Sequence, residues 1–257
     1  VENRHRQPVV GLQQENFYFT ENKRPVSNLQ FLGAASNNTE ADITIIIDRS
    51  NTSNKYRSEV ETAVKEIAAS MNGLGVLRVV SASSIPVTEY TGKPELLGEF
   101  NLDALKNPVA KTAALDLAIR LASNDLINAA KKRGIVMITA GDSNSITIDK
   151  YNLTGLTSYL GNNSISFSVV QVTQSALSEE LAYIADNTQG NTYYIYRPQG
   201  LSDVVKDIIE IPQGIYQLSF ESALPTNFGT SYLPVETEVY LLNRSGRDET
   251  GYFAPLK

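Results

Sequence analysis

Oxygen-bearing side chains follow a β-branched run early in the chain. The run Ile43–Ile47 ends at Asp48, and the hydroxyl residues Ser50 and Thr52 stand at the next alternate positions. One carboxylate and two hydroxyls are ligands of the kind that Mg²⁺ takes from proteins. The same side chains could instead accept hydrogen bonds from backbone N–H groups, holding a turn together and capping the helix that follows. The pattern leaves both interpretations open, a metal site or a capped turn.

Two later segments add side chains of the same kinds. Thr112 stands near the start of a helical pattern and has the same double interpretation, as a ligand or as a helix N-terminal residue. Asp142, Ser143 and Asn144 follow another apolar run, and Asp142 could join Asp48 or open an Asx turn of its own. Two carboxylates could also serve a divergent Mg²⁺-dependent hydrolase. Catalysis is the least favoured interpretation, because one histidine and no cysteine leave no recognisable nucleophile and base.

Composition argues against several other kinds of chemistry. The absence of cysteine removes thiol nucleophiles, disulfides and cysteine-ligated zinc or iron–sulfur sites. The only histidine, His5, lies in a polar N-terminal stretch, where we expect an exposed side chain without a catalytic role. A net charge of −6 and a pI near 5.0 argue against nucleic-acid binding, which needs clustered Lys and Arg. No apolar run in the sequence approaches the roughly 20 residues that span a bilayer.

The elements that must position these side chains alternate between strands and helices across residues 41–211. β-branched runs predict buried strands, and helical spacing of apolar residues predicts the helices between them. We expect strands at 43–48, 76–83, 133–141, 164–172 and 191–196, and helices at 55–72, 110–126, 149–162, 175–190 and 200–211. Such alternation predicts an α/β fold with a doubly wound, mostly parallel sheet. Ligand sites of these sheets lie at the carboxyl ends of the strands, so Asp48 and Asp142 should lie at one edge.

The two ends of the chain show a different pattern. Residues 1–40 and 212–257 contain short alternating segments that predict half-buried antiparallel strands. Neither end is long enough to form a comfortable core of its own, so we expect both ends to build one small β-sandwich-like module. The predicted domains are therefore an N-terminal β segment at 1–40, an α/β domain at 41–211 and a C-terminal β segment at 212–257.

The order and spacing of the polar segments resemble those of von Willebrand factor A (vWA) domains. In that family a strand ends in Asp-x-Ser-x-Ser/Thr, a later Thr opens a helix, and a third strand ends in Thr-Asp-Gly. The matching segments here are Asp48-Arg49-Ser50-Asn51-Thr52, Thr112 in "KTAALDLA", and "GIVMITAGDSNS". The resemblance covers residues 41–211. A weaker likeness links "PVVGLQQENFYFTENKRPV" to the β segment that precedes this domain in exported bacterial proteins.

The resemblance implies a metal-ion-dependent adhesion site (MIDAS), which binds a carboxylate of a partner protein and breaks no bond. The implied metal ligands are Asp48, Ser50, Thr52 and Thr112, and Asp142 of the third segment could swing in as a further one. Ala140 stands where the family has the Asp of Thr-Asp-Gly, and an alanine cannot ligate a cation or hold its water. One of two negative charges around the cation is thereby lost. Mg²⁺ should therefore bind weakly or not at all.

The function that the resemblance implies is a protein–protein interaction or cell-adhesion module of an exported bacterial protein, periplasmic or at the cell surface. The binding face would be the loops after Asp48, before Thr112 and after Thr139. Its expected contact residues are Arg49, Asn51, Ser143 and Asn144. The main alternative is a metal-independent scaffold or assembly subunit with a retired metal site. Metal dependence of folding or of partner binding separates the two.

Overall fold

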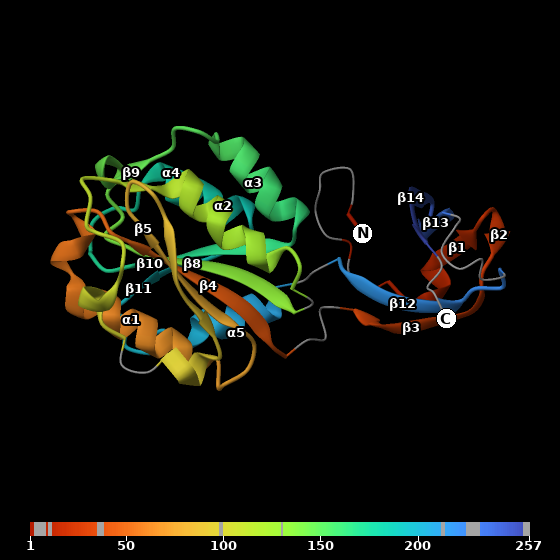
Figure 1. Cartoon of the computed structure of the whole chain (residues 1–257), viewed down its shortest axis with the longest axis horizontal. Coiled ribbons are helices and arrows are strands. Elements are labelled where there is room, and N and C mark those ends of the chain that lie inside the picture. Colours follow the sequence, from red (N-terminus) through yellow and green to blue (C-terminus); the bar gives the residue numbers. More distant parts are fainter. Residues whose placement is uncertain are drawn as a thin grey trace. The chain divides into compact units, whose positions relative to one another are not determined.

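The computed structural model describes residues 1–2, 9, 12–34, 39–97, 100–129, 131–211, 214–224 and 232–253. The chain forms two compact units, and each is built around its own sheets (Figure 1). The larger unit comprises Asn38–Ile211, and the smaller one comprises Val1–Asn37 together with Pro212–Lys257. His5 lies outside the described residues.

A six-stranded sheet forms the centre of the larger unit, in the order β11-β10-β8-β4-β5-β6. Neighbouring strands are parallel except for β6, which runs antiparallel to β5. All eight residues of the central strand β4 are buried, as expected for a continuous β-branched run covered on both faces. The strands are β4 (Ala41–Asp48), β5 (Leu77–Ala82), β6 (Val87–Gly92), β8 (Lys132–Thr139), β10 (Ile165–Gln171) and β11 (Thr192–Tyr194).

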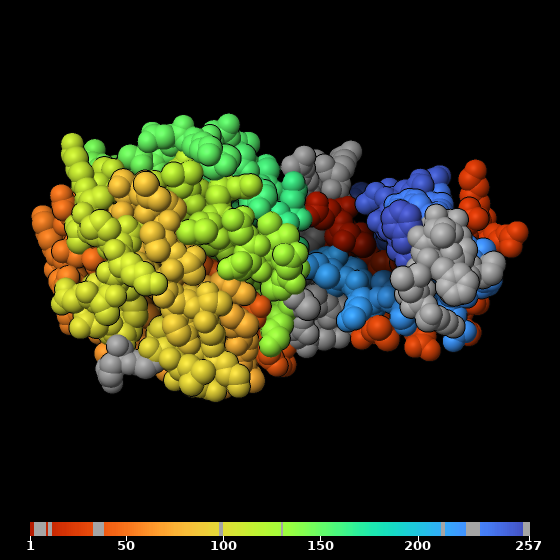
Figure 2. Space-filling model, in the orientation of Figure 1, coloured from red at the N-terminus to blue at the C-terminus, as the bar shows by residue number. Residues whose placement is uncertain are grey.

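Helices cover both faces of this sheet (Figure 1). One apolar core contains the buried faces of α1 (Arg57–Ser70) and α5 (Ser202–Glu210). The other contains those of α2 (Leu115–Leu126), α3 (Leu153–Asn162) and α4 (Glu179–Asn187). On the face seen in Figure 2, side chains of the segments coloured yellow and green form most of the surface of this unit. The predicted doubly wound, mostly parallel α/β fold is confirmed.

Strands from both chain ends build the smaller unit. One sheet has the order β14-β13-β1-β2, and β12 pairs with β3 in a second sheet. The Phe17 ring of β1 lies 5.2 Å from the Tyr216 ring of β12 and 6.2 Å from the Phe31 ring of β3, so aromatic side chains pack the two sheets together. The predicted β module from both ends is confirmed. Its strands are β1 (Phe17–Glu21), β2 (Arg24–Pro25), β3 (Ser27–Ala34), β12 (Tyr216–Glu221), β13 (Tyr232–Leu241) and β14 (Arg244–Phe253).

Three predicted helix starts are early by four or five residues, and the helix expected from residue 175 begins at Glu179, after the cap residue Ser178. The helix expected from residue 110 begins at Leu115, because Ala110 bridges to Ser50 and the short strand β7 (Ala113–Ala114) pairs with β9 (Ile146–Thr147). The helix expected from residue 149 begins at Leu153. The Asp116 carboxylate accepts the N–H groups of residues 150 and 151 at 2.7 and 3.0 Å, which holds that turn outside the helix. Among the helices of the described chain, none combines the length and apolarity needed to cross a bilayer.

Candidate functional site

The loop after β4 and the loop before α2 meet at the carboxyl edge of the sheet. The Asn51 N–H donates to the Ala110 carbonyl at 2.8 Å, and the Ala110 N–H donates to the Arg49 carbonyl at 3.0 Å. The Arg49 N–H in turn donates to the Ala82 carbonyl at the end of β5, at 2.8 Å. Three loops that are far apart in the sequence are therefore joined by their backbones. A doubly wound sheet predicts this edge as the site of binding.

The Asp48 carboxylate is enclosed in a hydrogen-bond network beneath these loops. Asp48 is 2% exposed. Its Oδ1 accepts the Ser50 N–H at 2.8 Å, and its Oδ2 accepts the Ser53 hydroxyl at 2.5 Å and the Thr139 hydroxyl at 2.7 Å. The Ser53 Oγ also accepts the Ala140 N–H at 2.8 Å, so the carboxylate holds the loop after β8 as well. Both carboxylate oxygens are engaged by the protein itself.

Burial dominates the electrostatics of Asp48. Loss of water raises the pKa of this carboxyl above its ordinary value of 3.8, and the hydrogen bonds from Ser53, Thr139 and Ser50 oppose that rise. A divalent cation beside the carboxylate would act strongly in the other direction. The hydrogen bonds of the network therefore offset part of the cost of removing this carboxylate from water.

The hydroxyl residues of the Asp-x-Ser-x-Thr segment have different surroundings. Ser50 is fully buried, and its Oγ accepts the Ser53 N–H at 3.2 Å. Thr52 precedes the 3₁₀ turn Ser53–Lys55 without capping it through its side chain. The residue before α1 is Tyr56, which makes no side-chain cap either. The alternative that Asp48, Ser50 and Thr52 cap the following helix is therefore wrong for α1, although Asp48 and Ser50 do hold the loop by hydrogen bonds.

Thr112 directly precedes the short strand β7. It is partly buried, and α2 starts only at Leu115 with Ala114 at the cap position. The interpretation of Thr112 as a helix N-terminal residue is therefore wrong. Thr112 lies in the loop that adjoins the Asp48 segment, and its predicted role as a metal ligand stays a prediction.

Asp142 forms a turn of its own. Its Oδ1 accepts the Asn144 N–H at 3.0 Å and the Asn144 side-chain amide at 3.2 Å, and its carbonyl accepts the Ser145 hydroxyl at 2.6 Å. This is the Asx turn that caps the 3₁₀ turn Ser143–Ser145. Ser143 and Asn144 are exposed on it. The carboxylate of Asp142 is thus partly used by its own loop.

A hollow of about 560 Å³ opens between these loops. It is lined by Thr52 and Tyr56 from the loop after β4 and by residues 140–143 from the loop after β8. Thr173 and residues 175–178 line it from the segment between β10 and α4, and Glu179 and Glu180 from the first turn of α4. Its walls carry many hydroxyls and three carboxylates, which belong to Asp142, Glu179 and Glu180. A hollow with such walls suits polar contacts with another molecule.

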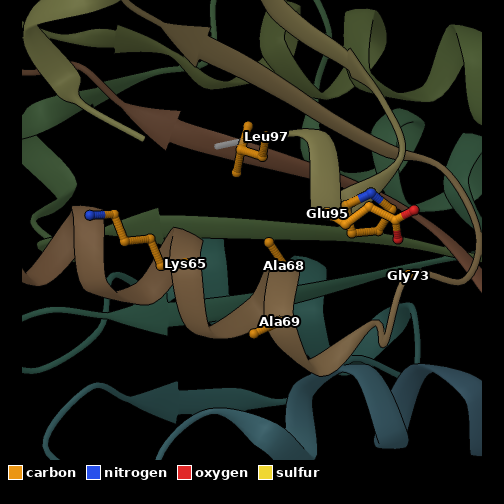
Figure 3. Close-up of a pocket in the computed structure, with 7 residues that line it drawn as sticks. Lys65, Ala68, Ala69, Gly73, Glu95 and Leu97 are labelled. Atoms are coloured by element: carbon orange, nitrogen blue, oxygen red, sulfur yellow. The ribbon is translucent and has the colours of Figure 1, made fainter. Parts of the chain in front are cut away.

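A second hollow, of about 280 Å³, lies beside α1 (Figure 3). It is lined by Lys65, Ala68 and Ala69 of the helix and by Glu95 and Leu97 of the 3₁₀ helix Pro94–Leu97, which follows β6. This small hollow offers no set of converging polar groups, so we assign no function to it.

Two residues of the network, Ser53 and Thr139, were not predicted as site residues from the sequence. Ser53 lies five positions after Asp48, outside the alternate spacing of the motif, and Thr139 lies 91 positions away. The available signal was the position of Thr139 near the end of a predicted strand, at the same carboxyl edge of the sheet as Asp48. Strand order is a tertiary property, so the sequence pattern alone could not pair the two side chains.

Comparisons with solved structures identify the fold. A von Willebrand factor type A protein from Catenulispora acidiphila matches with a TM-score of 0.53 and 13% identity, over 94% of this chain and 74% of that one. The chain has the von Willebrand factor A fold. At this identity the match shows the fold alone. No protein-family model matches the sequence, and no curated protein sequence is significantly similar to it.

A mussel protein is a further vWA neighbour. Proximal thread matrix protein 1 of the mussel byssus matches with a TM-score of 0.51 and 15% identity, over 75% of this chain and 49% of that one. Another structure of that protein, described as having a zinc-occupied MIDAS motif, matches with a TM-score of 0.51 and 16% identity, over 71% of this chain and 47% of that one. The match spans about half of the mussel protein, so its metal binding does not transfer to this chain.

The residues of this vWA fold fit a divalent cation poorly. Both oxygens of Asp48 and the Oγ of Ser50 already accept hydrogen bonds, and Ala140 offers no acid. Within the described residues, no group of three or more His, Cys, Asp or Glu side chains could hold a metal ion. Mg²⁺ needs a near-octahedral set of oxygens and sheds its water reluctantly. A cation at this position would compete with the hydroxyls of Ser53 and Thr139 for the Asp48 carboxylate.

Proposed function

We propose that this chain is a non-catalytic protein-interaction module, and that it binds its partner without a metal ion. The binding face is the set of loops after β4, before α2 and after β8. The observation that carries the proposal is the closed network around Asp48, whose carboxylate accepts three hydrogen bonds from the protein. The network makes the loops a rigid platform and uses the groups that a metal would need. The partner is a protein, and the export of the chain from a bacterial cell is part of the same proposal.

The distribution of charge around these loops supports the proposal that they bind one particular partner. Three carboxylates, those of Asp142, Glu179 and Glu180, line the hollow over β8 and β10. On the other side of β4, where the backbone N–H of Arg49 donates to the end of β5, the guanidinium groups of the buried Arg49 and the half-buried Arg57 lie near each other. A face with separated acidic and basic regions orients a partner and disfavours wrong ones.

A metal-free scaffold or assembly subunit is the alternative that the network favours equally. Both functions need a rigid vWA unit, and they differ in which surface meets the partner. We therefore place photo-crosslinking residues at Asn51 and Ser143, which are exposed on the proposed face, and at the exposed Asn162 as a matched control. Asn162 ends α3 and precedes β10, so it lies at the amino edge of the sheet.

The experiment combines crosslinking with removal of metal. In an extract of the source organism, we expect a defined crosslinked species from the Asn51 and Ser143 positions, unchanged by EDTA and absent from the Asn162 control. Crosslinking that EDTA abolishes would contradict the metal-free proposal. Crosslinking from Asn162 alone would move the partner to another surface and favour the scaffold function. Calorimetric titration of Mg²⁺ and Mn²⁺ into EDTA-treated protein completes the test. Saturable binding heat in the parent protein that is absent from Asp48→Ala would support a metal-dependent adhesion site instead.

A further inference from the structure

The guanidinium of Arg49 is buried and poorly hydrogen-bonded. Arg49 is 6% exposed, and its Nε has no hydrogen-bond partner. Its side chain makes one long hydrogen bond, from Nη1 to the Oδ1 of Asn54 at 3.4 Å. No carboxylate among the described residues lies within ion-pair distance of it. A buried charge without a partner is costly, so an arrangement of this kind calls for an explanation.

A second guanidinium converges on the same amide. Arg57 Nη1 lies 3.5 Å from the Oδ1 of Asn54, so two cations share one neutral oxygen. Arg57 Nη2 also binds the carboxylate of Asp103 at 2.5 Å, and that aspartate side chain is 76% exposed. Burial lowers the pKa of Arg49 below its ordinary value of 12.5, the neighbouring Arg57 lowers it further, and the carboxylates of Glu89 and Asp103 act in the opposite direction. Among the described residues, neither of these two acids forms an ion pair with Arg49 itself.

Arg78 provides an internal comparison. Its Nε and Nη1 are also buried without a hydrogen-bond partner. However, the Asp125 carboxylate lies 3.3 Å from the Arg78 Nε, so that guanidinium has a counter-ion of its own. Poor hydrogen bonding alone therefore does not set Arg49 apart. What does is that no carboxylate of the described residues lies within ion-pair distance of Arg49.

We infer that Arg49 and Arg57 form a receptor for a carboxylate that the partner protein presents. The planar guanidinium donates two parallel hydrogen bonds, and a carboxylate matches that geometry better than any neutral group. The Asn54 amide oxygen occupies the receptor as a weak neutral substitute, and a turn of its side chain would free the Nη1 groups of both arginines while Arg57 Nη2 stays on Asp103. Asp103 on Arg57 is an example of the same chemistry within the chain. The inference rests on the proposed function, because the receptor belongs to the loop after β4, and it adds the chemistry of the ligand.

The test uses the resonance of the Arg49 Nε–H group in the intact chain. Sodium acetate is the probe, and sodium chloride at equal ionic strength is the control. We expect the Arg49 resonance to shift saturably with acetate and not with chloride, while the Arg78 resonance stays unchanged. Arg57→Met should weaken the acetate response about tenfold, as expected for the loss of one charged hydrogen bond. Equal responses to acetate and chloride would overturn the inference, and a stronger saturable response to inorganic phosphate would overturn the choice of a carboxylate.

A second variant separates binding from folding. Arg49→Met keeps the bulk of the side chain and removes the uncompensated charge, so we expect an unchanged or higher Tm together with loss of the acetate response. Arg49→Lys keeps the charge without the planar fork and should respond weakly. A lower Tm in Arg49→Met, with no acetate response in the parent protein, would assign Arg49 to packing and overturn the inference. These measurements need no partner protein. The acetate test can therefore fail while crosslinking from Asn51 and Ser143 succeeds, which would overturn the carboxylate receptor alone. Crosslinking can equally fail while acetate binds, which would overturn the proposed binding face.

Discussion

Replacing Ala140 with aspartate should destabilise the metal-free protein by about 3–5 kcal/mol at neutral pH, the usual cost of an uncompensated buried charge. Ala140 is 2% exposed. Its N–H donates to the Ser53 Oγ at 2.8 Å, and its carbonyl accepts the Thr173 hydroxyl at 2.7 Å, so the backbone is held on both sides. Ser53 also bonds Asp48, which places a second carboxylate next to the first within one network. Two dehydrated acids in such proximity repel each other.

A cation would reverse much of this loss. If Ala140→Asp restores a metal site, Mg²⁺ at about 100 times its Kd should return about 2.7 kcal/mol. In a chain of this size, about 3 kcal/mol corresponds to a Tm decrease of roughly 6–12 °C. Ala140→Asn is the matched control, because asparagine has nearly the same volume without the charge. We expect it to cost about 1–3 kcal/mol through overpacking, with no response to Mg²⁺.

Urea denaturation with and without 5 mM EDTA, and thermal scans over a series of Mg²⁺ concentrations, measure both effects. The reasoning is refuted if Ala140→Asp is as stable as the parent protein in EDTA, since the position would then be open to water. It is also refuted if the parent protein itself gains stability from Mg²⁺, because the closed network would then be a metal site after all. Equal losses in the Asp and Asn variants would show that size, not charge, is decisive.

Three further changes test other parts of the structure by urea denaturation. Lys132 is fully buried and donates to the Ile211 carbonyl, and burial lowers its pKa below 10.5. Between this lowered pKa and pH 10.5, the unfolded chain binds more protons than the folded one, so the free energy of unfolding rises with pH there. The stability of the parent protein, measured relative to Lys132→Met, should therefore rise from pH 7 towards pH 10.5. A difference that does not depend on pH would contradict this. Gly141→Ala should cost about 1–3 kcal/mol, because φ is +81° and a Cβ would lie 2.8 Å from Gln171 Nε2; a neutral result would mean that this turn can adjust. Phe167→Ala should cost about 3–5 kcal/mol, because the ring is fully buried, and a loss below 1 kcal/mol would indicate collapse of the cavity.

The parallel sheet could be predicted because its strands are buried on both faces. β4, β8 and β10 have no exposed residue, and apolar and β-branched residues dominate their sequences without the spacing of a helix. The edge strand β6 could not be predicted in the same way. Its sequence VTEYTG is half-buried and partly polar, and no helix precedes it. Pairing with β5 at the sheet edge, rather than its own pattern, makes it a strand.

Helix starts were less predictable where tertiary contacts compete with local preference. The segment before α2 has good helix-forming residues, yet it is extended, because Ala110 pairs with Ser50 and Ala113–Ala114 pair with β9. The N-terminus of α3 was misplaced for a related reason, since the carboxylate of Asp116 on α2 holds the preceding turn. Both signals come from residues remote in sequence.

The same difficulty explains why one motif left two chemistries open. Asp48, Ser50 and Thr52 have the types and spacing of metal ligands, but spacing within one loop does not say what neutralises the carboxylate. Here Ser53 and Thr139 donate to it, and Ala140 supplies no second charge that would demand a cation. Removing Asp48 would leave three donors without their acceptor, at about 1–3 kcal/mol for each buried group left unpaired. The carboxylate is therefore retained by the structure without any metal, and its presence alone is weak evidence for one.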